Sequence, residues 1–94
     1  MEPVQIVLDE LIALRREAVS KLRLLPETQE KVVHDGKRKI DVCTYREESH
    51  SGRVIVTVKA FKGSGIIWAY ADGFAINSDG ELGELDKEER STLY

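Results

Sequence analysis

Apolar residues recur at helical spacing in the first quarter of the chain. Between residues 3 and 25 they come at steps of three and four, at Val4, Val7, Leu8, Leu11, Leu14, Ala18, Leu22 and Leu25. This spacing is typical of an α-helix with one broad apolar face. Pro3 suits the first helical turn, where its missing N–H costs nothing, and Pro26 ends the helix. The pattern predicts one helix of about 22 residues, roughly 33 Å long.

The period changes to that of β-strands after Pro26. Alternating or valine-rich runs predict five strands, at residues 29–34, 37–46, 53–62, 66–76 and 81–85. Asp35-Gly36 is a strong signal for a tight hairpin, and a glycine-rich turn at 63–65 separates the third and fourth strands. Because every connection is short, neighbouring strands should pair antiparallel as a meander. Gly73, inside the fourth strand, is expected to mark a bulge or a bend.

The connection between the last two strands has some features of a calcium-binding loop. Asn77 and Asp79 carry oxygens, and Gly80 follows where an EF-hand loop bends. Counted back from Gly80, however, the first ligand position is Ala75, which has no ligand atom, and the twelfth position is Asp86 instead of a glutamate. A turn explains the residues better, because Asn-Ser-Asp-Gly suits a type I turn followed by a left-handed glycine. We therefore predict a hairpin and no metal site here.

Together these elements predict an α+β fold in a single domain that spans residues 1–94. The size agrees, since domains of about 100 residues are the commonest. One long N-terminal helix is expected to pack on one face of a five-stranded antiparallel β-meander. Asp86 and Glu89 have the spacing of a capping box, which predicts a short helical turn at the C-terminal end.

Composition limits the class of protein further. Apolar residues make up 41% of the chain and charged residues 33%, which indicates a folded, soluble protein. No apolar run approaches the ~20 residues of a membrane helix, and the N-terminal residues lack the pattern of a signal peptide. Cys43 is the only cysteine, which excludes an internal disulfide and cysteine-rich zinc sites. We therefore expect a cytoplasmic protein with no membrane partner.

The charges are unevenly distributed along the chain. Residues 31–62 carry eight basic and four acidic side chains, and residues 63–94 carry two basic and seven acidic ones. Opposite charges attract within one fold, and a charged surface also steers a charged partner. The basic residues of the middle segment include Lys37, Arg38, Lys39, Arg46, Arg53, Lys59 and Lys62. With aromatic strand residues they suggest single-stranded nucleic acid on the sheet as an alternative function, although the chain is acidic overall and lacks a known RNA-binding motif.

Few residues suggest catalysis. His34 and His50 are the only histidines, and both fall at expected turns or loops, where nothing encloses them. Cys43 and Asp41 fall on one side of the same strand, without the glycine elbow or helix N-terminus that presents a nucleophile. No His, Asp or Glu spacing matches a metal site, and no glycine-rich loop precedes a helix to hold phosphate. An enzyme of unknown type is the third hypothesis, with no catalytic residue, metal or cofactor assigned.

The third and fourth strands are apolar on both faces, which is more than one helix covers. The third strand alternates between Val54, Val56, Val58 and Ala60 on one side and Ile55, Thr57, Lys59 and Phe61 on the other. The fourth strand has a small face and a bulky face, formed by Ile67, Ala69 and Ala71 and by Ile66, Trp68 and Tyr70 respectively. A helix packs closely over small residues, which leaves the bulky face open. In the reverse assignment, Trp68 lies in the core beneath the helix.

We therefore expect a small non-catalytic protein-binding module, of an accessory, inhibitor or immunity-like kind, that acts through the open face of its sheet. Self-association of two copies through that face is one form of this interaction. Exposed aromatic patches usually mark an interface with a partner or a second copy. The candidate binding residues are Trp68, Tyr70, Phe61 and Tyr45.

Overall fold

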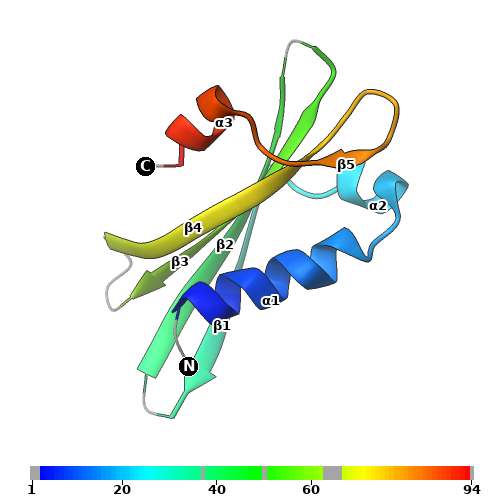
Figure 1. The fold of residues 1–94 in the computed structure, drawn as a ribbon. Helices are drawn as coiled ribbons and strands as arrows, with labels where there is room; N and C mark the ends of the chain where they lie inside the picture. Colours follow the sequence, from blue (N-terminus) through cyan, green and yellow to red (C-terminus); the bar gives the residue numbers. More distant parts are fainter. Residues whose placement is uncertain (1–2, 37, 50, 63–66, 94) are drawn as a thin grey trace.

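The computed structural model describes residues 3–36, 38–49, 51–62 and 67–93, with only the backbone described at residues 35, 38, 62 and 67–69. Along these residues lie α1 (Pro3–Arg15), α2 (Val19–Arg23), β1 (Thr28–Asp35), β2 (Arg38–Glu48), β3 (Val54–Lys62), β4 (Ile67–Ile76), β5 (Leu82–Gly83) and α3 (Lys87–Ser91) (Figure 1). The predicted α+β class is confirmed: an N-terminal helix, a five-stranded antiparallel sheet and a short C-terminal helix.

The strands form one sheet in the order β1-β2-β3-β4-β5, as the short connections predicted. β5 is shorter than expected and pairs only with the end of β4. The β3–β4 register shifts between Ala60 and Phe61, whereas Gly73 pairs regularly with Thr57. The bulge predicted at Gly73 is therefore wrong. The turn predicted at 63–65 lies outside the described residues.

Gly73 is required for close packing instead. A Cβ on this residue would clash with the Val56 carbonyl oxygen and would lie 3.3 Å from Leu85 Cδ1. The glycine therefore lets β3 approach β4 and makes room for a leucine from the C-terminal part of the chain. A glycine within a strand can mark either a close backbone approach or a bulge, and spacing alone does not separate the two.

The N-terminal helix is shorter than the apolar pattern predicted. α1 ends at Arg15, and α2 begins after Ala18, whose φ of −62° and ψ of 142° are extended. The break lets the chain turn, so that Leu22 of α2 is buried in the same core as Leu11 of α1. One continuous helix was the wrong prediction because the spacing of apolar residues does not reveal where a helix bends. None of the described helices is long and apolar enough to span a membrane.

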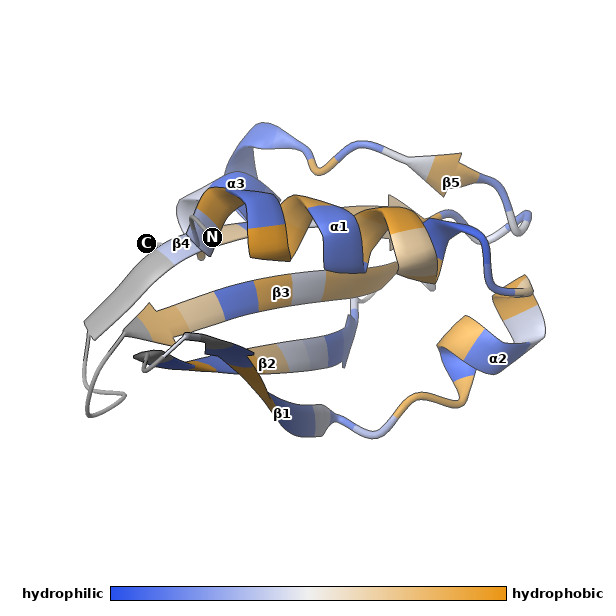
Figure 2. Cartoon of the chain, turned by 90° about the horizontal axis from the view of Figure 1, so that it is seen from below, coloured by the Kyte–Doolittle hydropathy of each residue, from blue (hydrophilic) through white to orange (hydrophobic). Residues whose placement is uncertain are grey.

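The main core lies between α1 and the sheet. Figure 2 shows α1 lying along β3 and β4, with hydrophobic residues on the strands beneath it. The core is formed by Ile6, Val7, Leu11 and Leu22 from the helices and by Ile40, Val42, Val54, Val56, Val58, Ala60, Phe74 and Ile76 from the strands. The strand residues mostly occupy alternate positions and therefore point to one face of the sheet. We call this face the helix side and the opposite face the far side.

A second, smaller core lies on the far side. Ala71 and Ala75 of β4 are covered there by Leu85 and Leu93, with Ile55 of β3 packed against them. The two leucines flank α3, which itself has no buried residue. We call residues 84–93 the C-terminal strap. In Figure 1, α3 and α1 lie on opposite sides of β4.

The predicted turn chemistry is confirmed at several places. Gly36 and Gly80 have φ values of 62° and 90°, which favour glycine. The Gly80 N–H donates to the Asn77 carbonyl at 2.9 Å and closes the hairpin before β5. Asp86 and Glu89 form the predicted capping box, in which each side chain accepts the other's backbone N–H at 2.8 Å.

Candidate protein-binding face

The far side of the sheet has a covered part and a bare part. The C-terminal strap covers the ends of β3 and β4 around Ile55 and Ala75. Neither core cluster of the described residues includes a far-side residue of β1 or β2. Val32 of β1 leaves 43% of its surface exposed, and Tyr45 and Phe61 are half-buried. The bare part therefore carries apolar and aromatic side chains.

Strand pairing places Tyr45 and Phe61 on the far side. Tyr45 pairs with Thr57, which lies between two core residues of β3, and Phe61 pairs with Asp41, which lies between two core residues of β2. Because successive side chains alternate, all four point away from the helix side. The Lys59 ammonium lies 5.5 Å from the centre of the Tyr45 ring, which agrees with this placement.

Tyr70 lies on the helix side, so its predicted place on the open face is wrong. It packs half-buried against the main core. Phe74 and Ile76, four and six residues further along β4, are fully buried on the same side of the sheet. Ala71 and Ala75 face the C-terminal strap. The sequence carried this signal, because the bulky face of β4 continues into Phe74 and Ile76 and has more apolar volume than the alanine face. The helix covers the face with the larger volume to bury.

The Trp68 side chain lies outside the described residues. Its backbone pairs with Phe61 across the β3–β4 ladder, beyond the register shift that follows Ala60. Trp68 therefore stays a predicted binding residue. Among the predicted residues with described side chains, the structure brings Tyr45 and Phe61 to the far side and separates Tyr70 from them.

Tyr45 borders two grooves on the molecular surface. The first, of 220 Å³, runs between the sheet and the C-terminal strap and is lined by Tyr45, Glu47, Thr57, Lys59, Thr92 and Leu93. The second, of 590 Å³, is lined by Glu27, Thr28, Tyr45, Arg46, Glu47 and Glu48. Both grooves combine an aromatic ring with several charged side chains. This mixture suits contact with a protein surface better than a small apolar ligand.

Two titratable groups of this face, Cys43 and Tyr45, have raised pKa values. Burial raises the pKa of the Cys43 thiol, and Glu30 and Asp41 raise it further, against a hydrogen bond with Tyr45 that lowers it. Burial also raises the pKa of Tyr45, and its hydrogen bond with Cys43 acts in the same direction. Both groups are therefore protonated at neutral pH, and neither is an activated nucleophile. His34 is exposed, and the other histidine lies outside the described residues.

The described residues contain no group of three His, Cys, Asp or Glu side chains placed to hold a metal ion.

Several basic residues expected on a nucleic-acid surface are engaged within the fold. Arg46 donates from Nε to the Leu25 carbonyl at 2.6 Å and from Nη1 to Glu48 at 3.1 Å. Lys59 lies over the Tyr45 ring, and Lys39 is exposed. The side chains of Lys37, Arg38 and Lys62 lie outside the described residues. Arg46 and Lys59 thus make contacts within the fold, and nucleic-acid binding stays a prediction.

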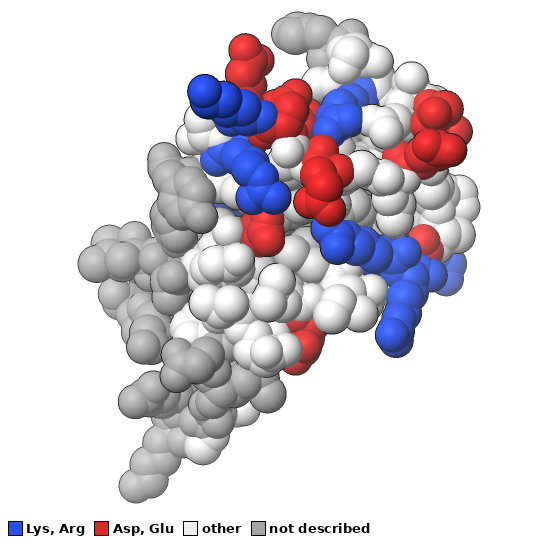
Figure 3. Space-filling model, viewed as in Figure 1, with Lys and Arg blue, Asp and Glu red and all other residues white. Residues whose placement is uncertain are grey.

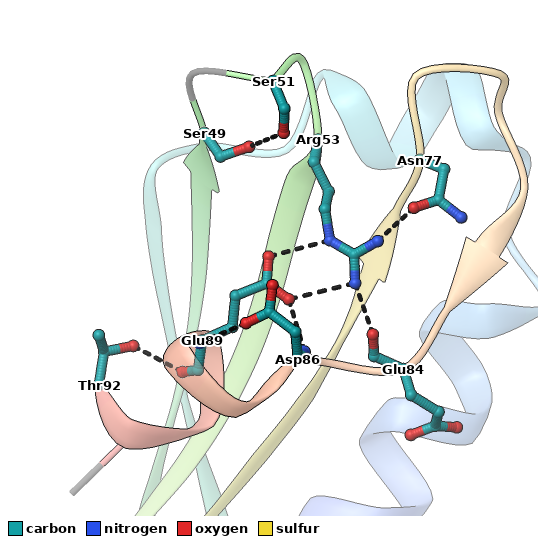
Figure 4. Close-up of polar contacts among 8 residues, drawn as sticks. All are labelled: Ser49, Ser51, Arg53, Asn77, Glu84, Asp86, Glu89 and Thr92. Carbon is teal, nitrogen blue, oxygen red and sulfur yellow. Dashed lines mark hydrogen bonds and ion pairs between the residues drawn. The ribbon is translucent and has the colours of Figure 1, made fainter.

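One arginine fastens the C-terminal strap to the sheet (Figure 4). Arg53, just before β3, donates from Nε and Nη2 to the two carboxylate oxygens of Glu89, at 2.9 and 3.1 Å. Nη2 also donates to the Glu84 carbonyl at 2.5 Å, and Nη1 donates to Asn77 Oδ1. The bonds with Glu89 raise the pKa of Arg53 above its usual value. The side chain of Arg53 is 22% exposed and that of Glu89 is 10% exposed, so this bidentate pair is largely shielded from water.

Sequence reasoning missed the role of Arg53. Asp86 and Glu89 were predicted to cap α3, but Arg53 lies 36 residues before Glu89 and no local pattern links them. The available signal was the opposite charge of residues 31–62 and 63–94. That signal indicates an attraction between segments without naming the two residues that meet.

A second exposed apolar surface lies on α1. Val4, Leu8 and Ile12 follow one another at four-residue steps and leave 42%, 37% and 48% of their surface exposed. The prediction that Val4 and Leu8 belong to the buried face is wrong, because the buried face is centred on Ile6 and Val7. In Figure 3 the described charged side chains gather toward the end with α3 and β5. The stripe formed by Val4, Leu8 and Ile12 is aliphatic and has no aromatic residue.

Comparison of the chain with protein-family models, with curated proteins and with solved structures found no match. The fold and the site together describe an α+β meander domain whose far side is covered in one part by its own C-terminal strap and is bare in another. Its function is therefore argued from these surfaces.

Proposed function

We propose that the protein is a non-catalytic protein-binding module whose partner docks on the bare part of the far side. The observation that carries this proposal is the presence of Val32, Tyr45 and Phe61 on a part of the sheet that lies outside both core clusters of the described residues. Aromatic residues are enriched in protein interfaces, and a paired strand holds them rigidly, which lowers the entropy cost of binding. A second copy of the chain is one partner that this surface suits.

The charges around these side chains indicate the kind of interface. Lys59 lies over the Tyr45 ring, and Glu30 and Asp41 lie close enough to raise the pKa of Cys43. Charges of both signs at the rim of an apolar centre set the orientation of a partner more than its affinity. The far side therefore favours a partner surface with its own mixed charges around an apolar centre.

The test compares capture of partners from native extract by the purified chain and by Tyr45→Ser and Phe61→Ser. If either residue is a central anchor worth about 2 kcal/mol, capture should weaken roughly 30-fold. Leu24→Ser is the matched control, since Leu24 is 83% exposed and lies at the end of α2, outside the sheet. Thermal melting must show all three variants folded. Undiminished capture by both aromatic variants would refute the proposal.

A further inference from the structure

The C-terminal strap occupies part of the far side through a few separate contacts. Leu85 and Leu93 fill the second core, with 5% and 3% of their surface exposed. Between them, Glu89 accepts two hydrogen bonds from Arg53. The remaining side chains of α3 are not buried. The strap thus presents one apolar side chain on each side of a carboxylate.

This attachment is independent of the main core. The second core shares no residue with the main one, and β5 before the strap pairs only with the end of β4. Release of the strap would therefore leave the pairing of β1, β2, β3 and β4 intact. Segments with few buried contacts open locally at a lower free energy than the whole domain.

We propose that the strap is a displaceable occupant of a binding site, and that the far side beneath it accepts a partner segment of the same chemistry. Such a segment is acidic and carries two apolar side chains around a carboxylate. Arg53 would pair with that carboxylate, and Ile55, Ala71 and Ala75 would contact the apolar side chains. The contacts that the strap makes with this site indicate which side chains the site accepts.

This inference extends the proposed function, because the covered site adjoins the bare part of the far side. The groove lined by Tyr45 and Thr57 is also lined by Thr92 and Leu93 of the strap. Displacement of the strap would join the two parts into one larger docking face. A tethered segment competes at an effective concentration of the order of millimolar, so a partner segment must bind more tightly than the strap does or arrive with further contacts.

The test uses a fluorescein-labelled synthetic peptide with the sequence of residues 84–93, ELDKEERSTL. It is titrated with the full chain and with full-length Leu93→Asp, in which the strap has lost one anchor. The peptide should bind Leu93→Asp at least about ten-fold more tightly than the unchanged chain, because the tethered competitor is weaker. Adding Arg53→Ala to Leu93→Asp should abolish binding. A peptide with glutamine in place of its glutamate at position 89 should bind more weakly.

Hydrogen exchange of the unchanged chain provides a second measurement. The amides of Arg90 and Leu93, which donate within the strap, should exchange at least about ten-fold faster than those in the middle of β3. Equal rates would overturn the inference, because the strap would then open only with the whole domain. A Leu93→Asp chain that fails to fold, or that folds and does not bind the peptide, would overturn it as well.

Phe61→Ser separates this inference from the proposed function. Phe61 lies on the bare part of the far side, so its loss should leave peptide binding unchanged while it reduces capture of the partner. If the peptide fails to bind but capture depends on Phe61, only the displaceable strap is refuted. If Tyr45→Ser and Phe61→Ser leave partner capture unchanged but the peptide binds as expected, only the proposed role of the bare part is refuted. The proposal for the site beneath the strap is then retained.

Discussion

Gly73 shows how a single position limits the packing of two strands and the C-terminal strap. Its absent side chain leaves room for the Val56 carbonyl and for Leu85. Gly73→Ala should therefore lower the free energy of unfolding by about 3 kcal/mol, because the strands cannot move apart without loss of their hydrogen bonds. Gly80→Ala is the control: Gly80 has a φ of 90° but nothing within 4 Å, so strain alone should cost roughly 1–2 kcal/mol. Urea unfolding measures both, and an equal cost would contradict this explanation.

Cys43 gives a prediction about pH. Burial raises the pKa of its thiol above the usual 9.0, so the folded state favours the protonated form. This stabilisation is complete below pH 9 and is lost as the pH rises through the folded-state pKa. Stability measured by urea unfolding should therefore fall above pH 9, and Cys43→Ala should reduce that fall. Iodoacetamide should react with the native thiol at pH 8 at least about ten-fold more slowly than with glutathione; an equally fast reaction would show that the thiol is accessible and ionised.

The sequence predicted residues whose role depends on their immediate neighbours. Gly80 in its turn and Asp86 in its capping box were found because a few adjacent residues define each motif. Residues whose role depends on another strand were misplaced. Tyr70 was assigned to the wrong face, since the decision between faces rests on how much volume each strand offers to α1. Alternation put Phe61 on the side of β3 opposite the valines, but the sequence left open which side the helix covers, and the structure places Tyr45 and Phe61 on the far side.

The break between α1 and α2 is the main feature of the helical region that the sequence did not show. Ala18 is the N-cap of α2 and makes no side-chain hydrogen bond to it. Ala18→Asp should therefore stabilise the protein by about 1 kcal/mol, because aspartate accepts a hydrogen bond from the free N–H groups of the first turn. In one continuous helix, aspartate at this position would be a poorer helix former than alanine and would destabilise it. Thermal melting gives the sign of the change, and a lower melting temperature would contradict the observed break.

The strands were predicted more completely than the helices. Each strand is bounded by a turn with its own chemistry, and the period of two is visible within a few residues. Helical periodicity, by contrast, continued across residues 16–18 although the helix does not. β5 was predicted too long. Only Leu82 and Gly83 of the predicted strand at 81–85 pair with β4. The order of the strands followed from the short connections alone.

The charge distribution is explained at the scale of the whole molecule. Residues 31–62 are basic and residues 63–94 are acidic, and the structure joins them through Arg53 and Glu89. Arg15 of α1 lies 3.8 Å from Glu84, at the start of the C-terminal strap. Surface pairs of this kind contribute little each, whereas the shielded pair of Arg53 is the stronger one. One basic residue of the middle segment and one acidic residue of the last segment therefore attach the strap within the fold.

Two exposed apolar surfaces compete for the role of interface in the whole molecule. The stripe of Val4, Leu8 and Ile12 lies on α1, and the bare part of the far side lies on the opposite face of the sheet. The far side is the better candidate because Tyr45 and Phe61 offer larger and more rigid contacts than aliphatic residues do. The central claim is that the partner contacts this face and not α1.

The most direct test places the photo-crosslinker p-benzoylphenylalanine at single positions of the full chain. Phe61 and Val32 report on the far side, Leu8 and Ile12 report on α1, and Leu24 is the exposed control. Ultraviolet irradiation in cells that produce the protein at its natural level, followed by gel electrophoresis, measures which positions form covalent adducts. We predict the same discrete adduct from Phe61 and Val32 and none from the other three positions. Adducts from Leu8 and Ile12 with none from Phe61 and Val32 would contradict the claim and would assign the interface to α1.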